Sequence, residues 1–336
     1  MKICVFGAGA IGGHLAAWMA RGGLEVSVVA RGAHLAAIQA RGLRYFSSSE
    51  DFTVPLRASA DARELGPQDL VIACVKAHSL PGAVDALQPL LGPETPVVFA
   101  INGVPWWYFH GIADQAGPVA AASEVPAAQR LPRLDPQGRL WRELGVERAI
   151  GCVVTSPNQI TEPGVVHNSL VTNSFVFGEP DGSESPRLAR IAAALKPALP
   201  GFGTSPRIRD LIWAKLSLNV ATSPLACLSF STVADYLGNP EMMALLRRLM
   251  HETRLVASSQ GVTVTADPEA AITRVSGSRH PPSMLQDLLA GRPLEIDGQL
   301  RAVQDLARLG RVETPALDLV LTLLGQRAQA AALAWA

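Results

Sequence analysis

The chain has 336 residues, of which 48% are hydrophobic and 17% are charged. This composition is typical of a well-packed globular protein, and the length favours two domains of about 100 to 200 residues each. Twenty-nine basic residues balance twenty-nine acidic ones, so no overall charge favours a nucleic acid or an anionic membrane as a partner.

The four cysteines lie far apart in apolar runs, outside any CxxC pair or Cys/His cluster: Cys4, Cys74, Cys152 and Cys227. We therefore expect buried free thiols, a cytoplasmic location and no metal site. The first residues are broken by glycines and lack the apolar run of a signal peptide. The sequence also shows no run of about 18 apolar residues that would indicate a membrane span.

The first part of the chain alternates apolar strands with helical patterns. A strand at 2–6 leads through glycines into a helix. Further strands are expected at 24–31, 69–76 and 96–102, with helices at 33–41 and 82–91. Strands that are apolar along their whole length are typical of a parallel sheet covered on both faces. The pattern predicts an α/β Rossmann dinucleotide-binding fold.

The pattern weakens from 103 to about 146, where prolines and the aromatic run Trp106, Trp107, Tyr108 and Phe109 indicate a loop-rich excursion. Three antiparallel strands, in RAIGCVVTSPNQ, GVVHNS and SFVFGEP, are expected to finish the sheet before a helix in RLARIAAALKPAL. Helical patterns then follow at 210–228, 240–260 and 293–308, and after Thr314, a predicted N-cap. We therefore place a Rossmann domain at 1–203 and an all-helical substrate domain at 204–336.

The glycines that follow the first strand have the G-x-G-x-x-G spacing of a dinucleotide-binding turn. The first permits a tight turn, the second lets the pyrophosphate approach the backbone, and the third lets helix and strand pack closely. The motif is weak alone, but here it follows a strand and opens a helix whose N-terminus attracts anions. The expected cofactor contacts in the turn are Gly7, Ala8, Gly9, Ala10, Ile11 and Gly12.

Two basic residues stand at the ends of neighbouring strands. Arg31 ends the second strand, where an NAD-binding protein carries an acidic residue for the ribose hydroxyls. A guanidinium there pairs instead with a 2′-phosphate, which favours NADPH over NADH. Lys76 ends the third strand and points toward the same edge of the sheet. The alternative for both is an ordinary surface side chain.

A polar stripe crosses the apolar helix expected at 210–228. Lys215, Asn219 and Ser223 are spaced four residues apart, which puts them on one face. Burying such groups is costly unless they meet partners or a ligand, so the stripe is a candidate site. From spacing alone, an exposed helix face is an equally good interpretation.

Two further segments extend this set: PPSMLQDLLAGRPLEIDG carries Ser283 and Glu295, and INGV carries Asn102. Together with the glycine turn, Lys76, the helix of Lys215 and the late LGRVETP segment, they resemble the ketopantoate reductase family, the 2-dehydropantoate 2-reductases. The resemblance spans nearly the whole chain, and its motifs stand in the family's order. It implies that a 2-oxo acid is reduced by NADPH in a cleft between a Rossmann domain and a helical domain.

The resemblance also implies residue roles. Lys215 matches the general acid that protonates the carbonyl oxygen, and Glu295 matches the acidic residue of the active site. Asn102, Asn219 and Ser283 match polar residues that hold substrate or cofactor, and we expect Asn102 and Glu295 to contact the cofactor as well. The chemistry is sound, since an ammonium beside the oxygen stabilises the negative charge that develops and then supplies the proton.

One position departs from the family. Ser223, expected to contact the substrate, stands where the best-known members carry a second asparagine, so recognition of a substrate hydroxyl differs. The aromatic run 106–109 either forms core, which we favour, or reshapes the pocket for a bulkier 2-oxo acid. Two alternatives thus remain: a related hydroxy-acid or opine-type dehydrogenase, and a non-catalytic NADP-binding sensor. A homodimer is the default assembly.

Overall fold

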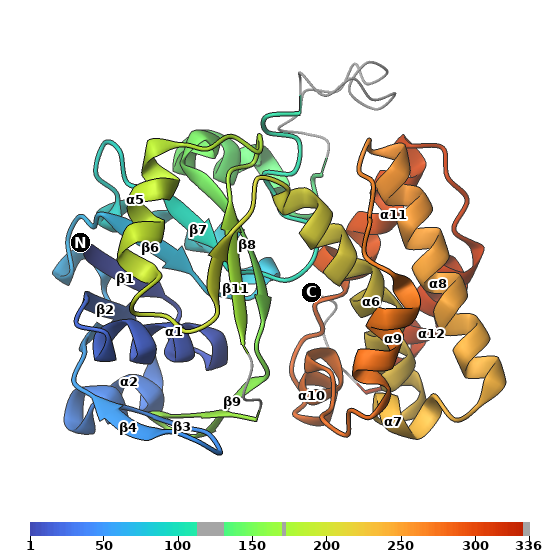
Figure 1. Cartoon of the computed structure of the whole chain (residues 1–336), viewed down its shortest axis with the longest axis horizontal. Coiled ribbons are helices and arrows are strands. Elements are labelled where there is room, and N and C mark those ends of the chain that lie inside the picture. The colour runs from blue at the N-terminus through green and yellow to red at the C-terminus, as the bar shows by residue number, and fades with distance from the viewer. Residues whose placement is uncertain (113–130, 170–172, 332–336) are drawn as a thin grey trace. The chain divides into compact units, whose positions relative to one another are not determined.

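The computed structural model describes residues 1–112, 131–169 and 173–331 and shows two compact units (Figure 1). The first unit comprises 1–101 and 138–208, and the second comprises 102–137 and 209–336. The late division, at 208/209, lies close to the boundary expected at 203/204. The segment 102–137, which the sequence places in the first domain, is grouped with the second unit.

The first unit contains an eight-stranded sheet with the strand order β12-β11-β8-β7-β6-β1-β2-β5. Neighbouring strands from β5 to β8 all run parallel. Strand β11 is antiparallel to β8, and β12 is parallel to β11. The strands are β1 Lys2–Phe6, β2 Glu25–Val29, β5 Arg57–Ser59, β6 Leu70–Ala73, β7 Val97–Phe99, β8 Ala149–Thr155, β11 Ser174–Gly178 and β12 Phe202–Thr204. The parallel α/β fold expected from the continuous apolar strands is confirmed.

The helices of this unit are α1 Ala10–Arg21, α2 Gly32–Arg41, α3 Val84–Leu87 and α5 Pro186–Leu195. Helix α5 begins as the sequence rules require, because the Ser185 side chain accepts a hydrogen bond from the Leu188 backbone N–H. The helix expected at 82–91 is broken into the short α3 and two flanking 3₁₀ turns. Pro89 lies in the second turn and offers no backbone N–H to continue an α-helix.

A second, four-stranded sheet has the order β4-β3-β10-β9. Its strands are β3 Leu43–Phe46, β4 Asp51–Val54, β9 Asn158–Glu162 and β10 Val165–Asn168. The expectation that three antiparallel strands finish the main sheet is therefore wrong for GVVHNS, which forms β10 and pairs with β3 and β9. It is wrong in part for RAIGCVVTSPNQ, because β8 runs parallel to β7.

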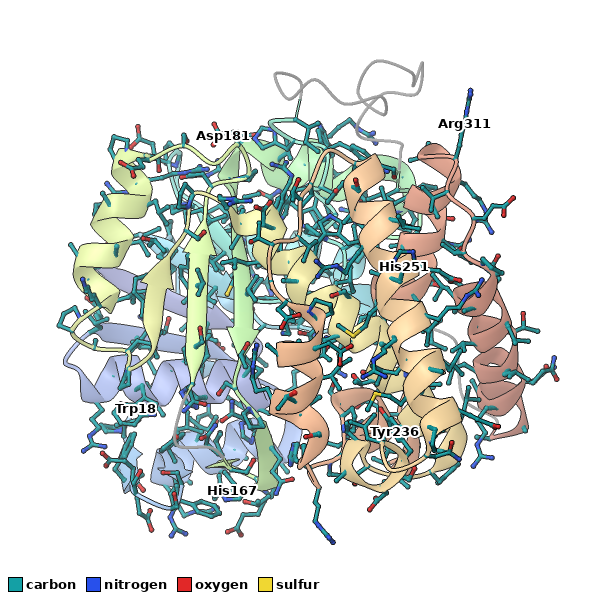
Figure 2. All side chains as sticks on the ribbon, turned by 45° about the vertical axis from the view of Figure 1, so that its right-hand side comes forward. Trp18, His167, Asp181, Tyr236, His251 and Arg311 are labelled. Carbon is teal, nitrogen blue, oxygen red and sulfur yellow. The ribbon has the colours of Figure 1, made fainter. Side chains whose placement is uncertain are left out.

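Helix α1 lies between the two sheets and contacts β1 and β2 on one side and β3, β4, β9 and β10 on the other. Trp18 (Figure 2) packs edge-on against Tyr45 and Phe52 of the small sheet. His14 of the same helix is 1% exposed, and its Nδ1 lies 2.9 Å from Asn158 Oδ1. These contacts fix the helix that follows the glycine turn.

The second unit is built of helices, which confirms the expected all-α architecture. They are α6 Ile208–Ser229, α7 Val233–Tyr236, α8 Pro240–Ser259, α9 Pro268–Ser276, α10 Ser283–Leu289, α11 Ala302–Leu309 and α12 Pro315–Ala330. The helix expected at 293–308 begins later, with a π-helical turn at Asp297–Arg301 that leads into α11. By length and composition α6 is apolar enough to cross a membrane, and 67% of its most apolar window is buried in the structure, as in a core helix.

The start of α12 is stabilised by a buried carboxylate from α8. Glu252, 4% exposed, accepts hydrogen bonds from the backbone N–H groups of Ala316 and Leu317 at 3.0 to 3.1 Å. Thr314 occupies the N-cap position as predicted, but its hydroxyl bonds to the Asp318 carboxylate instead of the backbone. The Glu252 carboxylate therefore takes the place of the side-chain cap that was expected from Thr314.

The aromatic run 106–109 belongs to the core of this second unit. All four rings are at most 6% exposed. Trp213 Nε1 of α6 donates a hydrogen bond to the Tyr108 hydroxyl (2.9 Å), and Arg209 donates to the Tyr108 carbonyl (3.0 Å). Burial raises the pKa of the Tyr108 hydroxyl, which stays protonated. The core interpretation of the aromatic run is supported, and these contacts explain why residues 106–109 belong with the helices of the second unit.

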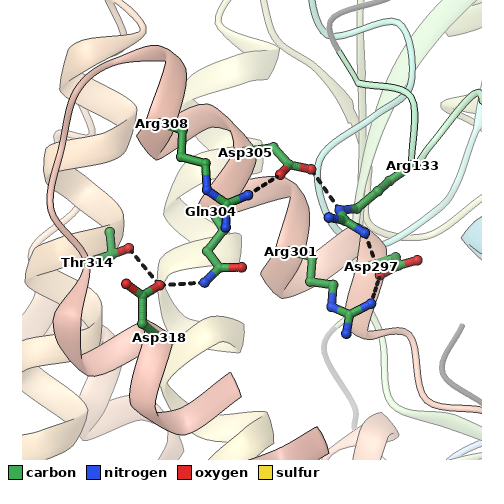
Figure 3. A network of polar contacts seen from close by, with 8 residues as sticks. All are labelled: Arg133, Asp297, Arg301, Gln304, Asp305, Arg308, Thr314 and Asp318. Carbon is green, nitrogen blue, oxygen red and sulfur yellow. Dashed lines mark hydrogen bonds and ion pairs between the residues drawn. The ribbon is translucent and has the colours of Figure 1, made fainter. Parts of the chain in front are cut away.

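Ion pairs also join the segment 131–137 to α11 and the π-helical turn. Arg133 contacts Asp305 at 2.8 Å and Asp297 at 4.0 Å, and the pairs continue to Arg301 and Arg308 (Figure 3). A hollow of about 580 Å³ beside this network is lined by Pro132, Arg133, Asp305, Arg308 and Leu309. Its lining includes no predicted site residue. The network joins the segment to α11 and the π-helical turn, although each partly exposed pair contributes little to stability.

Candidate active site

The glycine turn between β1 and α1 has the tight geometry that its spacing predicts. Gly7 has a φ of +100°, and the N–H groups of Gly7 and Ala8 both donate to the Val29 carbonyl at 3.1 Å. A Cβ on Gly12 would lie 2.1 Å from the Gly7 carbonyl oxygen. Helix α1 can therefore pack against the turn only because position 12 carries no side chain.

The N-terminus of α1 fits an anionic group. Gly9 is the N-cap residue, with no side-chain cap and no acidic residue in the first turn that holds Ala10, Ile11 and Gly12. Apart from its chain neighbours, no described residue has an atom within 4 Å of the position that a Gly9 Cβ would take. Open space beside an uncapped helix N-terminus is the setting in which a pyrophosphate binds.

Arg31 and Lys76 follow the two strands that flank β1. Arg31 is exposed at the N-cap of α2, directly beyond β2. Lys76 is half-buried beyond β6, whose end contacts the glycine turn, since a Gly7 Cβ would meet the Cys74 backbone at 3.2 Å. Open parallel sheets bind ligands at the carboxyl ends of their strands. The edge expected to hold the cofactor therefore carries two cations.

A histidine lies beside this edge without adding charge to it. His34 of α2 accepts a hydrogen bond on Nδ1 from the Gly164 backbone N–H at 3.0 Å. Burial lowers the pKa of this imidazole, against a smaller upward effect of the nearby Ala8 backbone. His34 is therefore neutral near pH 7, and Arg31 supplies the charge of this helix start.

In the second unit, the structure brings two of the predicted residues into direct contact. Lys215 Nζ of α6 donates a hydrogen bond to Asn102 Oδ1 at 2.7 Å. Lys215 and Asn219 are half-buried, and Ser223, one turn further along, is 4% exposed. The polar stripe is therefore not a solvated face, and its first member has the partner that a buried ammonium needs.

The segment after Asn102 lies against the π-helical turn. The Val104 N–H donates to the Gly298 carbonyl at 2.9 Å, and Gly103, with a φ of +95°, allows the approach because a Cβ there would lie 2.3 Å from that oxygen. The next residue, Gln299, accepts a hydrogen bond on Oε1 from Asn219 Nδ2 at 3.5 Å. Sequence reasoning missed Gln299. The one sequence feature that could have indicated it is its position four residues after Glu295, the predicted acidic residue of the site.

The remaining two predicted residues lie in different surroundings. Glu295 is 5% exposed and lies just before the π-helical turn. Ser283 is exposed in the first turn of α10. The structure thus buries the acidic residue close in sequence to Gln299, whereas the assignment of Ser283 stays an expectation from the resemblance.

Comparisons with known proteins extend these observations. Residues 3–118 match the family model Ketopantoate reductase PanE/ApbA, and residues 207–328 match Ketopantoate reductase PanE/ApbA C terminal. A 2-dehydropantoate 2-reductase from Mesorhizobium japonicum is 43% identical over 96% of this chain and 97% of its own. The crystal structure of 2-dehydropantoate 2-reductase from Geobacter metallireducens has a TM-score of 0.82 and 26% identity, covering 97% of this chain and 99% of its own.

The fold extends to a more distant enzyme. A D-mandelate dehydrogenase solved with NADH and anilino(oxo)acetate has a TM-score of 0.79 and 19% identity, covering 99% of this chain and all of its own. The family matches confirm the resemblance carried by the glycine turn, the α6 stripe and the EID segment. The chain belongs to the ketopantoate reductase family of nicotinamide-dependent oxidoreductases.

Proposed function

We propose that this protein reduces 2-dehydropantoate to pantoate with NADPH, and that Lys215 is the general acid. The observation that carries this proposal is the hydrogen bond between Lys215 and Asn102, at 2.7 Å, on the polar stripe of an otherwise apolar helix. The relative from Mesorhizobium japonicum, which carries the name 2-dehydropantoate 2-reductase, supports the choice of substrate.

The chemistry of the pair suits carbonyl reduction. An ammonium has three N–H donors, and the bond to Asn102 uses one of them to hold Nζ in position. When bound, the nicotinamide cofactor supplies the hydride that forms the new C–H bond. The charge that develops on the carbonyl oxygen is stabilised by Lys215, which then donates the proton that forms the hydroxyl.

The residues at the strand ends of the first unit fit the cofactor. The open space at Gly9 and the uncapped start of α1 would receive the pyrophosphate. The exposed guanidinium of Arg31 supports NADPH, because it would pair with a 2′-phosphate that NADH lacks. Lys76, Asn102 and Glu295 are proposed as further cofactor contacts on the resemblance, and Asn219, Ser223 and Ser283 as substrate contacts.

Kinetics of lysine variants test the proposal. Lys215→Ala should lower kcat for 2-dehydropantoate by about 10² to 10⁴, the usual contribution of a general acid. NADPH binding, measured by fluorescence titration, should change little. Lys196→Ala is the matched control, because Lys196 is exposed at the end of α5. Full turnover by Lys215→Ala would show that another group donates the proton.

Ser223 favours a second candidate, a related dehydrogenase that acts on another 2-oxo acid. A serine hydroxyl is shorter than an amide and recognises a substrate hydroxyl differently. A panel of 2-oxo acids followed by NADPH absorbance separates the two candidates, because the true substrate has the highest kcat/KM. A non-catalytic sensor would bind NADPH and oxidise it with none of them.

A further inference from the structure

We propose that Gln299 is a positioning residue that orients the Asn219 amide and so sets the preference for 2-oxo acids that carry a hydroxyl group. The inference rests on the proposed function, because it concerns how the same site selects its substrate. Gln299 lies in the π-helical turn Asp297–Arg301 and is 2% exposed. Its Oε1 accepts from Asn219 Nδ2 at 3.5 Å.

The oxygen and the nitrogen of the Gln299 side-chain amide differ in their hydrogen bonding. Gln299 Nε2 is buried and has no hydrogen-bond partner among the residues that the structure describes. An unmade hydrogen bond of a buried donor is a penalty that a leucine or methionine of similar size would avoid. The end that is used is the oxygen that receives Asn219. The contact with Asn219 is therefore the interaction that this side chain adds to the second unit.

The turn that carries Gln299 is held against the segment that carries the partner of Lys215. The Gly298 carbonyl accepts the Val104 N–H at 2.9 Å, and Gly103 leaves room for that contact. Asn102, two residues before Val104, is bonded to Lys215. Lys215 and Asn219 both lie on α6, and their partners Asn102 and Gln299 lie on two segments that the Val104–Gly298 hydrogen bond joins. A π-helical turn at such a place is a recurring feature of functional sites.

The hydrogen bond decides which end of Asn219 faces the substrate. With Nδ2 directed to Gln299, the opposite corner of the amide presents Oδ1, an acceptor, to a hydroxyl donor. Lys215 and Asn219 are one helical turn apart, so their Cβ atoms lie about 5 to 6 Å from each other. This spacing suits 2-dehydropantoate, whose hydroxyl is carried two carbon atoms beyond the carbonyl carbon.

The test compares two substrates that differ in this hydroxyl alone: 2-dehydropantoate and 3,3-dimethyl-2-oxobutanoate. Gln299→Met keeps the size of the side chain and removes the acceptor. It should lower kcat/KM for 2-dehydropantoate about tenfold, mainly through KM, the effect of about one hydrogen bond. The value for the analogue should change less than about twofold. Gln299→Glu, which keeps an acceptor oxygen, should restore part of the preference.

Three controls make the result decisive. The thermal midpoint of Gln299→Met should not fall, since an unpartnered buried donor is removed, and a purely structural role would lower it. Gln304→Met, at the surface of α11, should leave the substrate ratio unchanged. The double variant Asn219→Ala with Gln299→Met should be no worse than Asn219→Ala alone, because both changes remove the same contact.

The outcomes distinguish this inference from the proposed function. If wild-type protein reduces neither compound, the proposed function fails. The positioning role of Gln299 is overturned, while the function stands, if the wild type prefers 2-dehydropantoate but Gln299→Met lowers kcat/KM equally for both substrates. It is overturned likewise if the effects of Asn219→Ala and Gln299→Met on kcat/KM add in the double variant.

Discussion

Gly9, the N-cap of α1, and Gly12, in its first turn, should respond in opposite ways to substitution by alanine. At Gly12, alanine would place its Cβ 2.1 Å from the Gly7 carbonyl oxygen and 2.9 Å from Val5 Cγ1. At Gly9, the alanine Cβ would meet no described residue within 4 Å apart from its chain neighbours, and the φ of −68° suits any residue. Gly12→Ala should therefore damage the fold, and Gly9→Ala should damage cofactor binding.

The size of the Gly12 effect follows from the geometry. Non-bonded heavy atoms prefer separations of about 3.5 Å, so α1 and the turn must move apart by more than about 1 Å. The obstacle is a backbone carbonyl, which cannot rotate away as a side chain can. We expect a loss near the upper end of the range for overpacking, about 3 kcal/mol. For a unit of this size that loss lowers the thermal midpoint by about 6 to 12 °C.

The two variants are compared by thermal denaturation without cofactor and by titration with NADPH. Gly9→Ala should melt within a few degrees of the wild type, since its cost is limited to the weaker N-cap preference of alanine, about 1 kcal/mol. Its Kd for NADPH should rise at least about tenfold, because a methyl group enters the space of the pyrophosphate. Unchanged NADPH affinity in Gly9→Ala would refute the cofactor assignment of the turn, and an unchanged melt of Gly12→Ala would refute the packing argument.

Three further predictions concern other parts of the chain. Arg31→Ala should raise KM for NADPH by about 10- to 100-fold, the worth of a charge-assisted hydrogen bond, while KM for NADH stays unchanged; equal effects on both cofactors would remove the role of the 2′-phosphate. Burial lowers the pKa of His14 from 6.5 to about 4, against a smaller upward effect of Asn158. The unfolded chain takes up this proton below pH 6.5, whereas the folded protein does not until near pH 4, so the free energy of unfolding should fall by about 2 kcal/mol from pH 8 to pH 5. Urea denaturation of His14→Gln should lack this contribution. If the free energy of unfolding of the variant depended on pH as that of the wild type does, other groups would carry the effect. Glu252→Gln should lower the free energy of unfolding by about 1 to 2 kcal/mol through loss of the charge at the start of α12. Glu269→Gln, in an exposed pair with Arg247, should leave the urea midpoint unchanged. Equal urea midpoints for the two variants would contradict the capping role of Glu252.

Local patterns were sufficient for the elements whose partners are close in sequence. The order strand, glycine turn, helix and strand at the start of the chain correctly placed Gly7 directly after β1, Gly12 in α1 and Arg31 just beyond β2. The long helical patterns gave α6, α8 and α12 within a few residues of their ends. In each case periodicity or a glycine rule acts over one element and its neighbour.

The features that the sequence did not reveal depend on distant pairing. Strand β3 pairs with β10, which lies more than a hundred residues later, and both strands have only four residues. The aromatic run 106–109 signals burial without signalling which core it joins. Gln299 becomes recognisable as a site residue only through Asn219, on another helix. Pattern reasoning carries little information on such contacts, because they are fixed by tertiary packing.

The assignment of 102–137 to the second unit has a consequence for synthesis of the chain. The ribosome delivers this segment, with Asn102 and the aromatic run, before any of residues 209–331 exist. Tyr108 must wait for Arg209 and Trp213, and Asn102 for Lys215, while 138–208 emerges and completes the first unit. A nascent chain stalled near residue 208 would therefore expose four large aromatic side chains, and a fragment beginning at 209 would lack the part of its core that they supply. The all-helical unit cannot be excised as one contiguous piece, and during synthesis its core can be completed only after the strands of the sheet have emerged.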